Sequence, residues 1–141
     1  MRLEGEKLDQ YREEITGLCI EELDEDPVRG LIYFGIFEEE ESGLELKAVG
    51  AVKNYMGSWY LRNQVVKSEY RGRGLQRQLI KEGLEFLADK TDVVRVSVYP
   101  ENVYSKRNIE AEGFEFEKKK KLKDGKMVLV YKIRLNGNVQ N

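Results

Sequence analysis

The spacing of hydrophobic residues changes along the chain, and each spacing predicts a different element. Apolar residues recur every three to four positions over residues 6–20, which predicts a first amphipathic helix. Apolar, β-forming runs at residues 31–37 and 44–55 predict two antiparallel strands separated by a polar loop. A turn at residues 54–58 leads into a third run at 59–66, so these strands should form a meander.

The second half of the chain alternates between helix and strand. A helical spacing begins at Leu75 and ends near residues 88–90, and residues 93–99 then have the composition of a strand. Because a helix separates this strand from residues 59–66, the two should be parallel and joined by a right-handed crossover. The last predicted elements are a short helix at 102–113 and a hairpin of strands 114–122 and 126–134, which turns at Asp124-Gly125.

Length and composition favour a single domain at residues 1–135. A chain of 141 residues that is 40% hydrophobic and has two prolines can bury a core of its own. Residues 1–4 are expected to add an edge strand, residues 21–26 a short polar helical turn, and residues 136–141 a frayed tail.

The charge balance argues against nucleic acid or an anionic membrane as the main partner, because 24 basic and 26 acidic residues give a net charge of −2. The basic run at 118–121 could be a nucleic-acid patch, but its apolar neighbours Phe116 and Leu122 favour a solvated edge strand. No apolar run approaches the roughly 20 residues of a membrane span. We therefore expect a cytoplasmic protein, either a monomer or a homodimer.

The residue inventory excludes several kinds of chemistry. The chain has no histidine, so it cannot form a Ser-His or Cys-His nucleophile pair or a His-ligated zinc site. Cys19 is the only cysteine, which excludes an internal disulfide and a cysteine-based metal cluster. Its helical spacing from Ile15 and Leu18 favours a buried structural thiol over a reactive one. We expect no metal.

The turn between the third strand and the second helix has the composition of an anion site. Gly72 and Gly74 carry no side chain that would block the main chain, and the first N–H groups of a helix have no intrahelical partner. Arg71 and Arg73 add positive charge. The turn is neither a P-loop nor a dinucleotide-binding Gly-x-Gly-x-x-Gly motif, because no Gly-Lys-Ser/Thr is present and Arg77 replaces the third glycine.

Two motifs resemble a known family. Arg71-x-x-Gly74-x-Gln76 resembles the pyrophosphate-binding R/Q-x-x-G-x-G/A signature of the GNAT superfamily of acyl-CoA-dependent N-acyltransferases, although Gln76 replaces the usual small residue. The second stretch is similar to the GNAT segment in which an asparagine precedes a short helix and a terminal Gly-Phe. Its matching residues here are Asn102, Ser105, Gly113 and Phe114.

The resemblance implies an α/β (α+β) fold with a mixed central sheet of six to seven strands, whose parallel fourth and fifth strands splay apart, and three to four flanking helices. Acetyl-CoA would lie in the splay, with its pantetheine arm bonded to the main chain of Gln64 and Val66. Main-chain amides would hold its pyrophosphate, and polar side chains would line the arm from the other side. The implied pyrophosphate residues are Arg71, Gly72, Arg73, Gly74, Leu75 and Gln76, and the implied lining residues are Asn102, Ser105 and Asn108.

The implied reaction is direct attack of a primary amine on acetyl-CoA. An amine of pKa about 10.4 is neutral in only about one molecule in 2,500 at pH 7, so a base or a water chain must take its proton. The resemblance makes the main-chain N–H of Gln64 the oxyanion donor. Tyr60, on the strand face expected to hold Gln64 and Val66, is the candidate catalytic side chain, although a half-buried strand aromatic is the simpler interpretation of it.

The chain departs from the family where many members carry a tyrosine acid, because that position is Ile109. Tyr104 lies on nearly the opposite helical face, and Tyr131 is a weaker candidate. A non-catalytic domain that binds or senses acyl-CoA therefore remains the alternative. The acceptor is open between a small amine, an amino acid, a peptide N-terminus and a lysine side chain.

Overall fold

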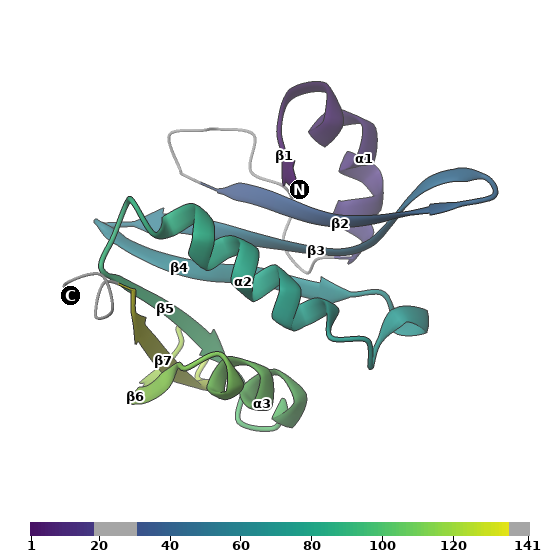
Figure 1. Ribbon diagram of the computed structural model, residues 1–141. Helices are drawn as coiled ribbons and strands as arrows, with labels where there is room; N and C mark the ends of the chain where they lie inside the picture. The colour runs from purple at the N-terminus through teal and green to yellow at the C-terminus, as the bar shows by residue number, and fades with distance from the viewer. Residues whose placement is uncertain (19–30, 136–141) are drawn as a thin grey trace.

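The computed structural model describes residues 1–18 and 31–135, which form a mixed sheet covered by helices (Figure 1). The sheet has seven strands in the order β1-β2-β3-β4-β5-β7-β6. Predictions for Cys19, residues 21–26 and residues 136–141 lie outside the described residues. The elements are β1 Arg2–Leu3, α1 Gly5–Leu18, β2 Ile32–Glu40, β3 Gly43–Tyr55, β4 Ser58–Val66, a 3-10 turn at Ser68–Tyr70, α2 Leu75–Leu87, β5 Val93–Val98, α3 Val103–Ala111, β6 Glu115–Lys121 and β7 Met127–Arg134.

The predicted fold class is confirmed. The meander of β2, β3 and β4 is antiparallel, and the predicted edge strand pairs with β2 as β1. The α2 crossover makes β4 and β5 parallel, and the C-terminal hairpin adds β7 beside β5 and β6 at the edge. No helix in residues 1–18 and 31–135 is both long and apolar enough to cross a bilayer.

The helices α1 and α2 pack on opposite faces of the sheet (Figure 1). On one face, Ile15 of α1 is buried against Val49 of β3. On the other, Leu79 and Ile80 of α2 pack into the larger core. Successive residues of a strand point to opposite faces, so each apolar strand supplies both cores. This explains why the strands read as continuous hydrophobic runs.

The strands β4 and β5 are paired over only part of their length. They separate after Leu61, because β4 continues beside β3 as far as Val66 while β5 continues beside β7 as far as Val98. This is the predicted splay, and it leaves one main-chain edge of β4 without a strand partner. The parallel pairs are Trp59↔Val94, Tyr60↔Arg95 and Leu61↔Val96.

A bulge in β4 reverses the faces of its side chains. The register with β3 shifts between Val49 and Ala51, so residues 63 and 64 together oppose Gly50. As a result Leu61 and Val66 both pack in the core under α2, although residues an odd number of positions apart in a regular strand point to opposite faces. The predicted common face of Tyr60 with Gln64 and Val66 is therefore wrong. Periodicity alone cannot reveal an inserted residue.

Candidate active site

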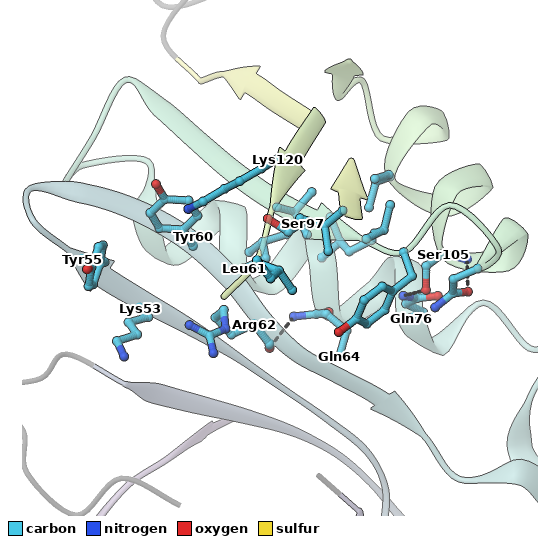
Figure 2. Close-up of a pocket in the computed structure, with 18 residues that line it drawn as sticks. Lys53, Tyr55, Tyr60, Leu61, Arg62, Gln64, Gln76, Ser97, Ser105 and Lys120 are labelled. Carbon is cyan, nitrogen blue, oxygen red and sulfur yellow. Dashed lines mark hydrogen bonds between the residues drawn. The ribbon is translucent and has the colours of Figure 1, made fainter. Parts of the chain in front are cut away.

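A cavity of about 540 Å³ lies where β4 and β5 separate (Figure 2). Residues of β3, β4, β5, α2, α3 and the β6–β7 hairpin line it, so segments far apart in the sequence meet there. Figure 2 shows Tyr60 and Lys120 at one end and Gln76 and Ser105 at the other. The predicted site residues that line it are Tyr60, Gln64, Gln76, Asn102 and Ser105; Val66, Asn108 and residues 71–75 do not.

The predicted anion turn has the required backbone. Gly72 and Gly74 have φ angles of 84° and 77°, which favour glycine, and a Cβ built at either would meet nothing within 4 Å. Gly74 is the N-cap of α2. Among the described residues, no main-chain N–H from Gly72 to Arg77 donates to a main-chain carbonyl. The start of α2 therefore presents unpartnered N–H groups beside an open, exposed turn.

The arginines around this turn differ in how far they are committed to other contacts. Arg71 Nε makes a long contact of 3.4 Å to the carbonyl oxygen of Val66, and the exposed Arg73 makes a long ion pair of 3.6 Å with Glu38. Arg77 donates to Glu112 at the end of α3 at 2.7 Å. Arg71 and Arg73 are thus held only by long contacts that a bound anion could replace, whereas Arg77 joins α2 to α3.

A buried lysine packs against the residue that precedes the turn. Lys47 is 1% exposed, contacts the carboxylates of Glu40 and Glu45, and lies 3.7 Å from the centre of the Tyr70 ring. Burial disfavours its charge, but hydrogen bonds to these groups outweigh burial and raise the pKa of Lys47. The Tyr70 ring also lies 5.1 Å below the Arg73 guanidinium. The charge of Lys47 is therefore fixed and holds Tyr70 beneath Arg73.

The side chain of Gln76 joins two of the predicted cofactor residues to α2. It is 5% exposed; its Nε2 donates to Ser105 Oγ at 3.0 Å, and its Oε1 accepts from Asn108 Nδ2 at 2.8 Å. Gln76 therefore does more than occupy the place of the small residue usual in the motif. Ser105 and Asn108 use polar atoms to join α3 to α2, and Asn108 is outside the cavity wall.

Both ends of α3 are capped. Asn102 Oδ1 accepts from the main-chain N–H of Ser105 at 3.1 Å. At the other end Gly113, with φ of 101°, donates to the Glu110 carbonyl, and Phe114 donates to the Ile109 carbonyl, which is a Schellman motif. These caps fix the wall of the cavity that α3 supplies.

Gln64 places an unsatisfied acceptor in the cavity. Its side chain lies over Gly50, where an added Cβ would come within 2.7 Å of Nε2. The Nε2 atom makes a long contact of 3.4 Å to the carbonyl oxygen of Arg62. Its Oε1 is buried and accepts no hydrogen bond from the described residues. A ligand N–H reaching this atom would satisfy it.

Comparisons with known proteins find likeness in structure rather than in sequence. No protein-family model matches the chain, and no curated protein matches it significantly. A candidate acetyltransferase from Acinetobacter baylyi ADP1 aligns with a TM-score of 0.73 and 18% identity over 99% of this chain and 94% of that one. The ribosomal-protein-S18-alanine N-acetyltransferase of Escherichia coli aligns with a TM-score of 0.69 and 16% identity over 96% of this chain and 94% of that one. YncA of Salmonella typhimurium is a candidate acetyltransferase solved with its cofactor acetyl-CoA. It aligns with a TM-score of 0.70 and 14% identity over 96% of this chain and 93% of that one.

The chain has the GNAT fold. The alignments cover nearly the whole of each chain, and the sheet has the parallel, splayed central strands that the sequence motifs imply. The GNAT fold also explains why Gln76 at the start of α2 and Ser105 at the start of α3 meet at one end of the cavity. Each of these helices follows one of the two strands that separate there.

The tyrosines considered for acid or base chemistry occupy different parts of this GNAT fold. Tyr60 lines the cavity. Ile109 is 2% exposed and also lines it, whereas Tyr104 is exposed and does not. Tyr131 lies in the core, where its hydroxyl donates to Glu110 at 3.3 Å; burial and then this carboxylate raise its pKa. Among these three tyrosines, Tyr60 is the one that lines the cavity.

A second, smaller cavity of about 250 Å³ adjoins the first and was missed by the sequence analysis. Its wall includes Lys118 and Lys120 of β6. The basic run 118–121 was interpreted as a solvated edge strand, and all four of its lysines are exposed. They differ in position, because Lys119 and Lys121 lie outside both cavities. The period of two in a strand was the signal that could have separated the two pairs of lysines.

Proposed function

We propose that this protein is an N-acetyltransferase that transfers the acetyl group of acetyl-CoA to a primary amine by direct attack. The observation that carries the proposal is the cavity at the splay of β4 and β5, which adjoins unpartnered N–H groups at the start of α2. Its volume of about 540 Å³ lies within the usual range for small-molecule sites. The acetyl-CoA found with YncA supports the choice of donor.

The residues present fit acetyl-CoA. Its pyrophosphate would bind the N–H groups of residues 72–76, and Arg71 and Arg73 would neutralise its charge. At Gln64 and Val66 the edge of β4 that faces the splay has no strand partner among the described residues, and it can bond the amides of an extended pantetheine arm as a strand would. The buried Oε1 of Gln64 would accept an N–H from the same arm.

The reaction needs a neutral amine and a donor for the developing oxyanion. The amine nitrogen forms a bond to the thioester carbon, the carbon–sulfur bond breaks, and the thiolate that leaves takes up one proton while the amine loses one to water. The main-chain N–H of Gln64, where β4 leaves β5, is the proposed oxyanion donor. A thiol of pKa near 8.5 leaves readily, so an apolar Ile109 at the family's acid position is compatible with turnover.

Tyr60 is the proposed side chain for relaying the amine proton. It lies on β4 between Lys53 of β3 and Arg95 of β5, and it lines both cavities. Tyr60→Phe removes only the hydroxyl, so we expect kcat to fall on the order of 10²-fold, the lower end for a general acid–base group. Acetyl-CoA affinity should not change. An unchanged kcat would leave Tyr60 as a structural aromatic.

The direct test of the function is release of free thiol from acetyl-CoA across a panel of amines, with the acetylated product identified by mass spectrometry. An N-acetyltransferase releases thiol only when an acceptor is present and forms one acetylamine for each thiol. The non-catalytic alternative predicts that acetyl-CoA raises the melting temperature without any turnover. If acetyl-CoA neither binds nor is turned over, both functions are refuted.

A further inference from the structure

We propose that the acceptor amine carries a compact anionic group, a carboxylate or a phosphate, which binds in the second cavity beside Lys118 and Lys120. This inference rests on the proposed function and narrows its substrate class. It uses residues that no part of the transfer chemistry above requires.

The two cavities adjoin at the acceptor end and share part of their wall. Tyr60, Ser97 and Lys120 line both of them. Figure 2 shows Lys120 reaching toward Tyr60 at the end of the main cavity that is remote from Gln76 and Ser105. An acceptor whose amine lies beside Tyr60 can therefore place an anionic group in the second cavity.

The charged side chains that line the two cavities are all cationic. Among the described residues, neither cavity is lined by an aspartate or a glutamate. Lys118 and Lys120 make no ion pair with any described carboxylate. Arg95 is held by Glu117 through two contacts of 2.9 and 3.2 Å, so its charge is largely balanced. The lysines thus leave an excess of positive charge at the acceptor end.

This excess selects between classes of amine. An acceptor with only an ammonium group, such as a lysine side chain, would meet like charge and no carboxylate to hold it. An acceptor with a carboxylate or phosphate would gain charge-assisted hydrogen bonds from the lysines. The same cations disfavour the ammonium form of the bound amine, which favours the neutral nucleophile that the reaction needs.

The size of the second cavity favours a compact anion. About 250 Å³ is below the usual range for drug-sized ligands, so the cavity suits the anionic group of an acceptor rather than the whole acceptor. A carboxylate and a phosphate share this chemistry. Matched pairs of acceptors can separate them.

The test measures kcat/KM by thiol release for phosphoethanolamine against ethanolamine and for phenylalanine against phenylalaninamide. We expect the anionic member of at least one pair to be preferred by at least about tenfold, and the pair that shows the preference identifies the anion. The amide is the less basic amine and has more neutral nucleophile at pH 7, so a preference for phenylalanine cannot come from basicity. Equal or better rates for both uncharged members would overturn the proposal.

A matched pair of double variants tests the lysines. Lys118→Gln with Lys120→Gln removes two charges from the cavity wall, and Lys119→Gln with Lys121→Gln removes two exposed charges from the same strand. The first variant should lose the preference by at least about fivefold, mainly through KM, while the second keeps it. Equal losses in both would mean a general charge effect and would refute a specific site.

Binding measurements separate failure of this proposal from failure of the proposed function. Turnover of uncharged amines without binding of phosphoethanolamine or phenylalanine would refute the anion site and leave the transferase. Calorimetric binding of either anionic amine that the Lys118 and Lys120 variant abolishes, without turnover of any amine, would support the anion site and refute the transferase. If no anionic amine binds and no amine is turned over, the anion site and the transferase are both refuted.

Discussion

The two ends of the main cavity offer a ligand different kinds of group. Beside the α2 end, residues 72–76 present main-chain N–H donors from one short segment. At the Tyr60 end the groups are side chains from several strands, among them Lys53 of β3 and Lys120 of β6. A main-chain site tolerates most side-chain changes, whereas a side-chain site is altered by each one. Side-chain substitutions can therefore alter the Tyr60 end while leaving the main-chain N–H groups at the α2 end unchanged.

The largest effect should come from placing a negative charge in the main-chain site. Gly74→Glu puts a carboxylate beside the turn, and like-charge repulsion of several kcal/mol should lower acetyl-CoA affinity by about 100-fold or more. Acetyl-CoA at about a hundredfold excess over Kd should raise the melting temperature of the unaltered protein by about 10 °C, and that of the variant hardly at all. Differential scanning fluorimetry measures both.

Gly125→Glu is the matched control for this variant. Gly125 has φ of 89° in the β6–β7 turn, and a Cβ there meets nothing within 4 Å, so its backbone strain resembles that at Gly74. Both variants should lose similar stability, but only Gly74→Glu should lose the cofactor response. A full response in Gly74→Glu would remove the turn from the cofactor site.

The next effect concerns the boundary between the two ends. Gln76→Ala keeps the main-chain N–H but leaves buried polar groups of Ser105 and Asn108 without partners. The free energy of unfolding should fall by about 1–3 kcal/mol, while acetyl-CoA affinity changes by less than about tenfold. Urea unfolding with and without acetyl-CoA measures both. Exposed Gln78 on the same helix is the control, and Gln78→Ala should have an effect within about 0.5 kcal/mol.

A smaller effect is expected at Ile109. Ile109→Tyr adds a phenol in the cavity wall that can protonate the departing thiolate, and we expect kcat to change by less than about tenfold because the thiolate already leaves readily. The larger ring in a buried position should cost about 1–3 kcal/mol of stability. Tyr104→Phe should change neither quantity. Loss of turnover in Tyr104→Phe with an intact fold would make Tyr104 the acid.

The smallest effect is a pH dependence at the side-chain end. The hydrogen bonds from Arg95, and to a lesser extent Lys132, lower the pKa of Glu117 despite partial burial. Because the folded pKa is lowered, its stabilisation is present above about pH 4.5 and is lost as the pH falls through the folded value. Glu117→Gln should therefore lower the melting temperature at pH 7 and have less effect below about pH 4.

Glu115→Gln is the control, since Glu115 is exposed on the same strand and forms no ion pair with the described residues. Its melting temperature should follow that of the unaltered protein at every pH. A constant difference between Glu117→Gln and the unaltered protein from pH 3 to pH 7 would show that the ion pair with Arg95 does not stabilise the fold.

The sequence by itself determined the features that depend on nearby residues. Gly72 and Gly74 specify a left-handed turn before α2, Asn102 and Gly113 specify the caps of α3, and the apolar spacing specifies each strand and helix. These follow from local backbone preferences, which one segment of the chain is enough to reveal. The resemblance to the GNAT motifs then implied the splayed sheet.

Only the tertiary structure decided which side chains meet. The bulge opposite Gly50 moved Gln64 to the face away from Tyr60, since one inserted residue reverses every later side chain of a strand. The contacts of Gln76 with Ser105 and Asn108 join residues about 30 positions apart, which no local preference specifies. Lys120 likewise reaches the cavity only because β6 folds back along β7. The backbone site follows from local sequence, and the side-chain site follows from packing.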